Sequence, residues 1–367
     1  MAERERIVVL GAAGRDFHDF QVLYRDDPTV RVLAFTAAQI PGISGRRFPA
    51  SLSGAHHPDG IPIVPEEDLE DLLRRERVGA VAFAYSDVSH GHVLGLAERS
   101  LAAGCDFRLH APDHTWVPAR IPVLAVCAVR TGCGKSQIAR WLGQRLRARG
   151  LRAAAMRHPM PYGDLERQRV QRFASRADLD AASCTAEERE EYEPHLEAGN
   201  VVFAGVDTAA LVALAEAEAD VVVWDGGNND FPLVRPDLLV CVADALRPGQ
   251  ATGWHPGEAV LRRADVIVVN KVDAAPPGQA DAVVAEVRAV NPRAPVVRAA
   301  SPVRLEDEAA VRGRRVLVVE DGPTLTHGGM AFGAGTVAAR AAGAAEIVDP
   351  RPFAAPALRA VYARYPH

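Results

Sequence analysis

A short glycine-containing stretch, TGCGKS at residues 131–136, has the residue types that bind nucleotide phosphates. Glycines let backbone amides surround an anion, a lysine fits between phosphate oxygens, and a serine hydroxyl is a ligand for Mg²⁺. The alternative is an ordinary glycine-bearing turn, because Val129 stands where the full phosphate-loop pattern begins with glycine. An apolar run precedes the stretch and an amphipathic helical pattern follows it, which favours the phosphate loop. We predict that the phosphates contact Thr131, Gly132, Cys133, Gly134, Lys135, Ser136 and Gln137.

The use of lysine supports this interpretation. Of the 42 basic residues, only Lys135 and Lys271 are lysines, and all the others are arginines. One lies in TGCGKS and the other in the sequence NKVD. A compact ammonium group on a flexible stem fits along a nucleotide where a planar guanidinium does not. The two lysines therefore indicate a common nucleotide site.

A second candidate is DVVVWDGGNND at residues 220–230, in which four apolar residues lead to Asp225. A carboxylate that ends a buried strand can reach Mg²⁺ directly or through water, and the Gly226-Gly227 pair would let the next loop approach a γ-phosphate. We predict Ser136 and Asp225 as the metal-binding residues, with Lys135 and Asp225 acting in catalysis. The alternative for Asp225 is a turn or a helix cap.

The sequence NKVD at residues 270–273 follows another apolar run. Asp273 could accept two hydrogen bonds from guanine, the stem of Lys271 could lie along the base, and Asn270 could tie neighbouring loops together. The backbone of residues 299–301 could complete the pocket. We therefore predict that Asn270, Lys271 and Asp273 bind the base.

A basic segment at residues 157–172 follows the predicted strand after the phosphate-loop helix. We predict that Arg157 and His158 act in catalysis, and that Arg167, Arg169 and Arg172 bind an anionic substrate and offset charge in phosphoryl transfer. The alternative is a solvated helix face, with Arg167 paired to the nearby acids Asp164 and Glu166.

Polar residues also follow two predicted strands near the start of the chain. Arg15, Asp16 and His18 follow the first strand, and Asp87 and His90 follow a later one. The carboxyl ends of parallel strands are where open α/β sheets bind ligands, so we predict these five residues as substrate-binding. The alternative is helix capping by the two aspartates.

The tail contains a glycine-rich stretch, EDGPTLTHGGMAFGAG, at residues 320–335. Backbone amides of such a loop could hold a phosphate, and His327 could act as an acid or base near neutral pH. The alternative is a surface turn.

Composition excludes several classes of protein. The 367 residues are 48% hydrophobic and 24% charged with a net charge of −5, so no basic excess points to nucleic acid. No apolar run is long enough for a membrane span, no signal-like segment is present, and we expect a cytoplasmic protein without a membrane partner. The five cysteines lack the spacing of a disulfide framework or zinc site. Cys133 differs from the others because the following helix could lower its pKa.

Alternating strand and helix patterns predict an α/β fold in three parts. Residues 1–118 form a Rossmann-like domain with a parallel sheet. Residues 119–310 form a P-loop NTPase domain. Residues 311–367 form a C-terminal α/β segment with the glycine-rich loop.

Motifs over almost the whole chain carry a family resemblance. They are GAAGRDFHDF, AFTAAQIPGISGRR, FAYSDVSH, AVRTGCGKSQ, RHPMPYGDLERQRVQRF, EEREEYEPH, WDGGNNDFP, NKVD and EDGPTLTHGGM. The chain resembles the P-loop predicted GTPases that include, or lie close to, the cyclic 2,3-diphosphoglycerate synthetases. The resemblance implies an ATP-driven enzyme that closes an intramolecular phosphoanhydride, and a homodimer. TGxGKS is also similar to the dethiobiotin synthetase and metallochaperone branch, in part of which a second lysine stands near Arg130.

Together these features predict an Mg²⁺-dependent enzyme that uses ATP or GTP to phosphorylate or cyclise a small phosphorylated acid held between the two α/β domains. NKVD favours guanine, whereas the resemblance implies ATP. The alternative is a regulatory or metallochaperone-type GTPase that acts through a protein partner.

Overall fold

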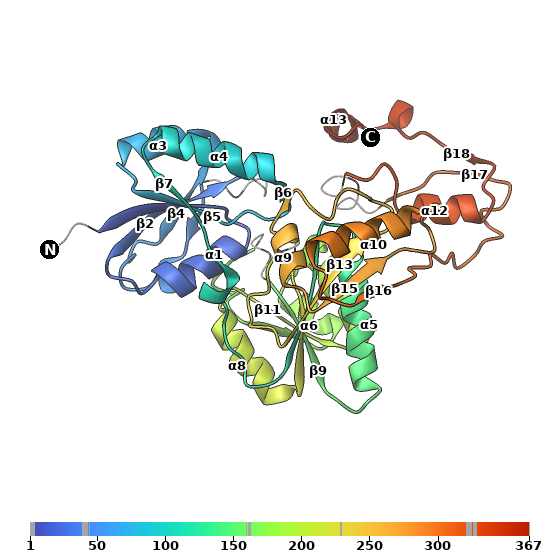
Figure 1. Ribbon diagram of the computed structural model, residues 1–367, viewed down its shortest axis with the longest axis horizontal. Helices are drawn as coiled ribbons and strands as arrows, with labels where there is room; N and C mark the ends of the chain where they lie inside the picture. Colours follow the sequence, from blue (N-terminus) through green and yellow to red (C-terminus); the bar gives the residue numbers. More distant parts are fainter. Residues whose placement is uncertain are drawn as a thin grey trace.

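Two parallel β-sheets, each covered by helices, form the two main bodies of the molecule (Figure 1). The computed structural model describes residues 4–38, 43, 45–158, 160, 163–227, 230–320, 325 and 329–366. The carboxyl-terminal segment, drawn in red, lies at the end of the molecule opposite the first sheet (Figure 1). The chain is therefore a mixed α/β protein.

The first sheet has six strands in the order β3-β4-β2-β1-β5-β7, and only β3 and β4 pair antiparallel. Its central strands are short apolar runs because helices cover both faces of the sheet. The strands are β1 Glu5–Leu10, β2 Val30–Ala37, β3 Arg47–Phe48, β4 Ile61–Pro65, β5 Ala80–Phe83 and β7 Asp106–Leu109. The helices are α1 Arg15–Asp19, α2 Ala50–Ser53, α3 Leu69–Arg75 and α4 His90–Ala102, with shorter helical turns at Phe20–Tyr24, Glu66–Asp68 and Pro112–His114.

Four buried phenylalanines pack against one another near the start of the first domain. The ring of Phe17 on α1 lies 5.0 Å from that of Phe35 on β2 and 4.8 Å from that of Phe48. Phe20 packs edge-on against the same two rings. Aromatic pairs at these distances contribute beyond the area that they bury. This packing holds α1, and with it the polar loop after β1, over the end of the first sheet.

The second sheet has eight strands in the order β10-β11-β9-β12-β8-β13-β15-β16, and only β10 and β11 pair antiparallel. The strand β8 leads into TGCGKS, and its neighbour β12 ends at Asp225. The strands are β8 Val123–Ala128, β9 Ala153–Arg157, β10 Gln171–Phe173, β11 Val201–Ala204, β12 Val221–Asp225, β13 Leu238–Asp244, β15 Val266–Asn270 and β16 Val296–Arg298. The helices are α5 Lys135–Arg147, α6 Arg176–Ala181, α7 Ala186–Glu197, α8 Thr208–Glu218, α9 Gly257–Arg263 and α10 Gln279–Val290.

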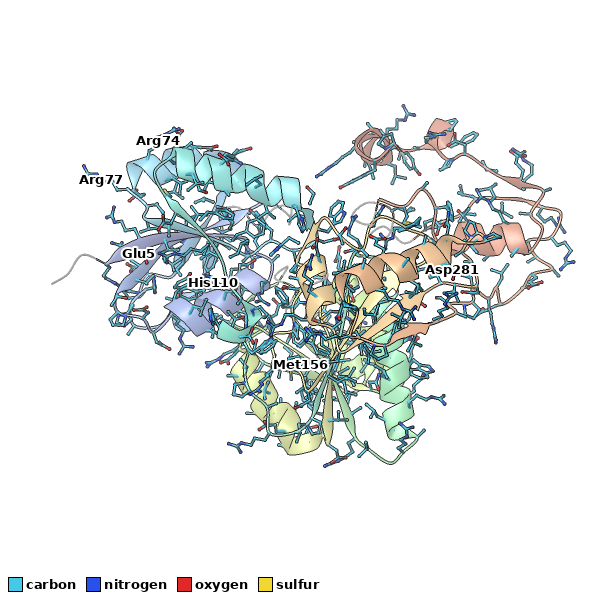
Figure 2. The ribbon with its side chains drawn as sticks, in the orientation of Figure 1. Glu5, Arg74, Arg77, His110, Met156 and Asp281 are labelled. Atoms are coloured by element: carbon cyan, nitrogen blue, oxygen red, sulfur yellow. The ribbon has the colours of Figure 1, made fainter. Side chains whose placement is uncertain are left out.

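Side chains separate clearly into interior and surface in this second domain. Met156 on β9 is fully buried within the sheet, whereas Asp281 on α10 is exposed (Figure 2). Among the described residues, no helix is both long and apolar enough to span a bilayer.

The polar segment between β9 and β11 is more ordered than its sequence suggests. It contains β10, α6 and α7, and both helices begin with a capping box, at Ser175 with Asp178 and at Thr185 with Glu188. The helix α7 buries Glu188 and His195 instead of an apolar stripe, so it lacks the periodicity by which helices are found in a sequence.

The carboxyl-terminal segment contains a two-stranded parallel pair, β17 Arg315–Val316 and β18 Glu346–Ile347, and the helices α12 Ala334–Ala341 and α13 Pro356–Arg364 with a turn at Arg351–Phe353. The predicted glycine-rich loop differs from expectation where it is described. The carboxylate of Glu320 accepts the N–H groups of Gly333, Gly335 and Thr336 at 2.7–3.1 Å. Those amides therefore bind a side chain of this protein, while His327 lies outside the described residues.

A pair of short strands joins the two domains. The strand β6, Val88–Ser89, belongs to the first domain and pairs antiparallel with β14, Trp254–His255, of the second. Beside it, the guanidinium of Arg130 lies 3.3 Å from the ring centre of Trp254 and 2.8 Å from the carboxylate of Asp87. The side chain of Arg130 thus faces the first domain.

His18 forms a second contact between the domains. Its Nε2 lies 2.7 Å from the carbonyl oxygen of Thr115, and its Nδ1 lies 3.1 Å from the hydroxyl of Thr208. Because a carbonyl can only accept, Nε2 carries the proton and Nδ1 accepts from Thr208. Burial, with a smaller effect of Arg15, lowers the pKa of His18 from 6.5 to about 3. The imidazole is therefore neutral at physiological pH.

The neutral state of His18 predicts a pH-dependent stability. Above pH ~6.5 the histidine is neutral in both the folded and the unfolded chain. As the pH falls below that value, only the unfolded chain gains the proton, so the folded state loses about 1.4 kcal/mol per pH unit down to the folded pKa. We expect urea unfolding of His18→Gln to show a shallower pH dependence than the wild type between pH 7 and 5.

Thr208→Val is the matched control. It removes the hydrogen bond but keeps the titrating ring, so it should lower stability at every pH and retain the wild-type slope. Equal slopes for wild type and His18→Gln would contradict the assignment.

Candidate active site

The turn between β8 and α5 has the backbone shape of a phosphate-binding loop. Gly132 and Gly134 have φ angles of 83° and 94°, in the left-handed region that glycine tolerates best. Gly134 also directly precedes α5 and is crowded, because a Cβ there would lie 2.3 Å from Nδ2 of Asn270. Glycine is therefore required at position 134 for both its conformation and its size.

Lys135, Ser136 and Asp225 meet at the end of this turn, as their sequence positions predicted. The ammonium of Lys135 lies 2.8 Å from Oδ1 of Asp225 and also donates to the carbonyl of Gly226. The hydroxyl of Ser136 donates to the same Oδ1 at 3.2 Å. The pairing of β12 with β8 produces this meeting, since the register sets Asp225 opposite Val126.

The other oxygen of Asp225 contacts two more groups. Arg157, at the end of β9, donates to Oδ2, and Nε2 of His195 on α7 lies 2.9 Å from it. Burial opposes the ionisation of Asp225, but Arg157, Lys135 and His195 together hold its pKa well below 3.8. Asp225 is thus a fully buried, permanent anion, which suits a group that positions cations.

Sequence reasoning did not identify the role of α7. Glu191 and His195 are four residues apart, so they lie on one face of the helix. Glu191 accepts from the guanidinium of Arg157, and Nδ1 of His195 contacts the amide of Asn200 at 3.3 Å. In the sequence, the motif EEREEYEPH contributed only to the family resemblance. The spacing of Glu191 and His195, four residues apart, could nevertheless have indicated that both side chains support Asp225 from one helix face.

His158 lies beside this centre. Burial first, and then Arg157 and Lys135, lower its pKa from 6.5 to about 3. A Cβ at Gly227 would lie 1.8 Å from Cε1 of His158, so the second glycine of the pair is needed to accommodate the imidazole. His158 is neutral at physiological pH and does not supply positive charge for phosphoryl transfer.

The NKVD segment contacts the phosphate loop. The amide of Asn270 donates to the carbonyl of Cys133 at 2.9 Å, and the ammonium of Lys271 donates to the carbonyl of Gly132 at 2.6 Å. The exposed Asp273 accepts the N–H of Ser301 at 2.8 Å. The two lysines of the chain therefore serve one loop, and residues 273 and 301 are neighbours as predicted.

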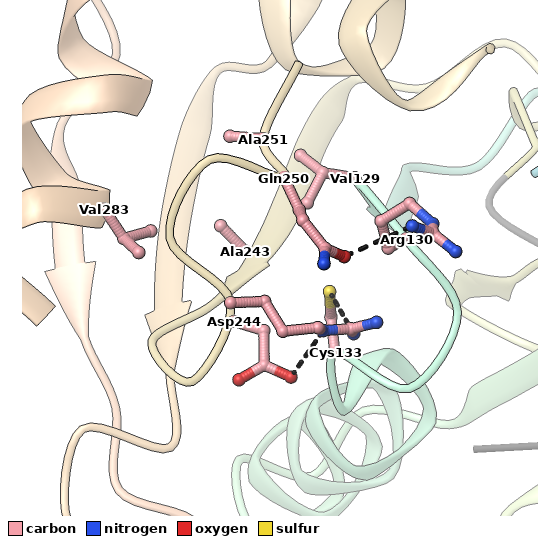
Figure 3. A pocket seen from close by; sticks show the side chains of 9 residues that line it. Val129, Arg130, Cys133, Ala243, Asp244, Gln250, Ala251 and Val283 are labelled. Atoms are coloured by element: carbon pink, nitrogen blue, oxygen red, sulfur yellow. Dashed lines mark hydrogen bonds and ion pairs between the residues drawn. The ribbon is translucent and has the colours of Figure 1, made fainter. Parts of the chain in front are cut away.

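Cys133 differs from the sequence-based expectation. Its thiol is fully buried beneath the loop, where a guanidinium nitrogen of Arg247 lies 3.3 Å from the sulfur (Figure 3). Burial raises the pKa of Cys133, because it outweighs the nearby positive charges of Arg247 and Lys271. The prediction of a lowered pKa was wrong, since the side chain points into the core and not toward the helix end.

The predicted substrate residues of the first domain have divided roles. His18 and Asp87 make the contacts between domains described above, and His90 is exposed and lies 3.8 Å from Glu258. Asp16 lies within α1 and accepts three backbone N–H groups, from Ala13, Gly14 and Phe17, but the cap residue of this helix is Gly14 and that of α4 is Ser89, so neither aspartate is a helix cap. Arg15 bonds to Asp19, Thr115, Asp230 and the carbonyl of Phe231.

The predicted arginine cluster does not assemble over the phosphate loop. Arg169 pairs with Asp207 at the start of α8, and Arg172 pairs with Glu218 at its other end. Arg167 is exposed on the same segment. The segment is not the helix face of the alternative either, since Arg172 lies on β10 and the acids that pair with Arg169 and Arg172 belong to α8 and its N-cap. Of the predicted basic residues in this segment, Arg157 contacts the active centre.

A cavity lies between the domains beside this centre. Its own volume is about 30 Å³, and about 390 Å³ of empty space is present when the adjoining open solvent is included. It is lined by Ala13, Arg15, Asp16, Ala84, Ser86, His158, Trp224, Gly227 and Asp230. The loop after β1 and the loops after β9 and β12 thus share one cavity.

Comparison with known proteins places this arrangement in a family. No protein-family model matches the chain. It is 54% identical over 369 residues to the protein named arginine synthetase ArcE of Thermococcus kodakarensis, a match that covers 100% of this chain and 82% of that protein. The chain belongs to the arginine synthetase ArcE family.

Two further relatives are less similar to this chain. A cyclic 2,3-diphosphoglycerate synthetase of Rubrobacter xylanophilus is 29% identical over 72% of this chain and 66% of its own length. A tetraacyldisaccharide 4'-kinase of Anaeromyxobacter dehalogenans is 32% identical over 68% of each chain. The predicted resemblance to cyclic 2,3-diphosphoglycerate synthetases is confirmed as a distant relationship, and all three relatives are enzymes by name.

The requirement for glycine at position 134 gives a testable prediction. We expect Gly134→Ala to lose at least about 100-fold in nucleotide affinity, because the methyl group would displace Asn270 and distort the amides of the loop. Equilibrium binding of a fluorescent ATP or GTP analogue measures this effect.

Gly150→Ala is the matched control, since Gly150 also has a positive φ but has nothing within 4 Å of its added Cβ. It should cost about 1 kcal/mol of stability and leave nucleotide affinity unchanged. Normal affinity in Gly134→Ala would show that the loop does not bind phosphates.

Proposed function

We propose that this protein is a nucleotide-driven arginine synthetase, which uses the γ-phosphoryl group of ATP or GTP to form a carbon–nitrogen bond of the guanidinium group of arginine. The observation that carries the proposal is the 54% identity to an arginine synthetase over the whole chain. The buried Lys135–Asp225 pair at the end of a glycine loop supports it.

The chemistry needs a phosphoryl transfer. The ureido group of citrulline differs from the guanidinium of arginine by an oxygen in place of one nitrogen, and that oxygen is a poor leaving group. When the ureido oxygen attacks the γ-phosphorus, the nucleoside diphosphate leaves. Ammonia then attacks the carbon, and phosphate departs with the former ureido oxygen. One triphosphate, one ammonia and one citrulline give one diphosphate, one phosphate and one arginine.

The residues of the loop suit the first step. The backbone amides and Lys135 would hold the β- and γ-phosphates and stabilise charge on the transferring group. Arg157 and His195 keep Asp225 ionised and fixed behind Lys135. These contacts fix Asp225 at the point where Lys135 would meet the phosphates.

Mg²⁺ fits the same donors. The hydroxyl of Ser136 and the carboxylate of Asp225 lie 3.2 Å apart and are the oxygen ligands that this ion prefers. Mg²⁺ there would neutralise phosphate charge. Asp225 would contact it through water, because both of its oxygens already bind cationic or polar side chains.

The position of the Asp273 carboxylate favours GTP over ATP. Its exposed carboxylate, held by Ser301, can accept hydrogen bonds from the N1 and amino group of guanine, which adenine lacks. Asn270 and Lys271 connect this point to the phosphate loop. The family resemblance implies ATP, so both nucleotides belong in the assay.

The deciding experiment supplies the full chain with citrulline, ¹⁵N-labelled ammonium, Mg²⁺ and either ATP or GTP. We expect ¹⁵N in the guanidinium of arginine, detected by mass spectrometry, only when a triphosphate is present. A parallel reaction with 2,3-diphosphoglycerate, followed by phosphorus NMR, tests cyclisation of a phosphorylated acid. Formation of a cyclic product without arginine would contradict the proposal and favour a cyclising synthetase. Nucleotide hydrolysis that neither citrulline nor 2,3-diphosphoglycerate stimulates would favour the regulatory GTPase.

Lys135→Ala tests the loop within that assay. Loss of the ammonium that faces the transferring group should lower arginine formation at least about 100-fold. Arg152→Ala, which removes an exposed surface charge paired with Asp220, should leave the rate unchanged. Equal rates for Lys135→Ala and the wild type would remove the loop from the mechanism.

A further inference from the structure

The cavity between the domains lies at the ligand-binding edge of both sheets. In the first sheet, strand order reverses between β1 and β5, and the loops that follow these strands supply Ala13, Asp16 and Ser86 to the cavity wall. Ligands of open parallel sheets bind at such a reversal. In the second sheet, His158 and Gly227 follow the neighbouring strands β9 and β12. The cavity is thus the common crevice of the two sheets.

The wall of this cavity carries an excess of negative charge. Asp16 and Asp230 line it together with Arg15, whose guanidinium lies 2.9 Å from Asp19 and 3.5 Å from Asp230. Burial raises the pKa of Asp230 to about 7 despite Arg15, and raises that of Asp16 to about 6 despite three backbone N–H groups. Both carboxylates are therefore costly to ionise until a cation reaches them.

Two polar atoms at the wall have no partner within the described part of the chain. They are the indole Nε1 of Trp224, a residue only 1% exposed, and Nδ1 of His158. A buried indole N–H without an acceptor is rare in folded proteins and indicates a site that a ligand completes. A carboxylate on the ligand would satisfy Trp224, while a cation on the same ligand would satisfy Asp230.

The cavity also adjoins the reacting end of the nucleotide site. Trp224 and Gly227 flank the segment that contains Asp225 and Gly226, both of which bind Lys135. A molecule in the cavity would consequently lie close to Lys135, the group that we propose contacts the γ-phosphate. An anionic phosphorylated acid would meet Asp16 and Asp230 there, which disfavours it.

We propose that the cavity between the domains binds an amino acid with a planar nitrogen cation, the guanidinium of arginine, through the carboxylate of Asp230. This inference rests on the proposed function, and it adds the location at which the product arginine is held and the residue that recognises its guanidinium. Asp230 lies three residues beyond the paired glycines of the second domain.

Calorimetric titration of L-arginine into the full chain with Mg²⁺ and nucleoside diphosphate tests the proposal. We expect Asp230→Asn to weaken arginine binding at least tenfold. Asp220→Asn, which changes an aspartate paired with Arg152 on the surface, should bind arginine as the wild type does. Nucleotide affinity should be the same in all three proteins, because Asp230 does not contact the phosphate loop.

The pH dependence gives an independent measure. The groups that face Asp230 are Arg15, Asp19, Asp16 and His158, of which His158 stays neutral above pH 5 because its pKa is about 3. Protonation of Asp230 removes the charge that binds the cation, so arginine affinity in the wild type should fall as the pH drops through about 7. In Asp230→Asn this fall should be absent or reduced to the smaller effect of Asp16.

Trp224→Phe provides a second variant that keeps the ring and removes only the N–H. It should weaken arginine binding at least threefold without changing nucleotide affinity. Wild-type arginine affinity in both Asp230→Asn and Trp224→Phe, or tighter binding of 2,3-diphosphoglycerate than of arginine, overturns the inference. If arginine is still synthesised with an unchanged KM by Asp230→Asn, the proposed function stands and only this site is wrong.

Discussion

The buried carboxylate of Asp225 is the constraint on which the nucleotide site depends. Isolated in the interior, such a charge would cost several kcal/mol, so it must be matched by cations and hydrogen bonds. Lys135 begins α5, Arg157 ends β9 and His195 lies on α7, and each bonds to this one group. Four elements are thereby fixed relative to one another. The end of the glycine loop is thus held in shape by side chains from three other elements of the protein.

Charge is divided between the two sides of this centre. Lys135 and Arg157 lie at the glycine loop, where we propose that the triphosphate binds. Asp16 and Asp230 lie on the side of the cavity between the domains. A triphosphate and a second anion would compete for the same few cations, whereas a triphosphate and the cationic product arginine would complement the two sides. The charges of the chain are therefore arranged to suit the two ligands that we propose.

Motifs with a strict local geometry could be read directly from the sequence. The strand–loop–helix around Lys135, the strand ending in Asp225 and the loop of Asn270 all place a polar residue at the end of an apolar run. Contacts that depend on the tertiary fold could not be read in this way. The segment of Arg169 and Arg172 looked like an anion site because its charges cluster in sequence, but neighbouring elements supply their partners. The helix that carries His195 was not predicted from the sequence, because it buries polar groups and hydrophobic periodicity detects only apolar faces.

The small strand pair β6–β14 restricts how the molecule can open. It connects the domains by backbone hydrogen bonds directly beside Asp87, whose carboxylate holds both Arg130 and the N–H of Thr131 at the first turn of the phosphate loop. Together with the His18–Thr208 contact and the bonds of Arg15 to Asp230 and Phe231, it ties the two sheets to each other at several points along their common crevice. A displacement of β6 against β14 would act on Asp87 and, through its carboxylate, on the backbone at Thr131.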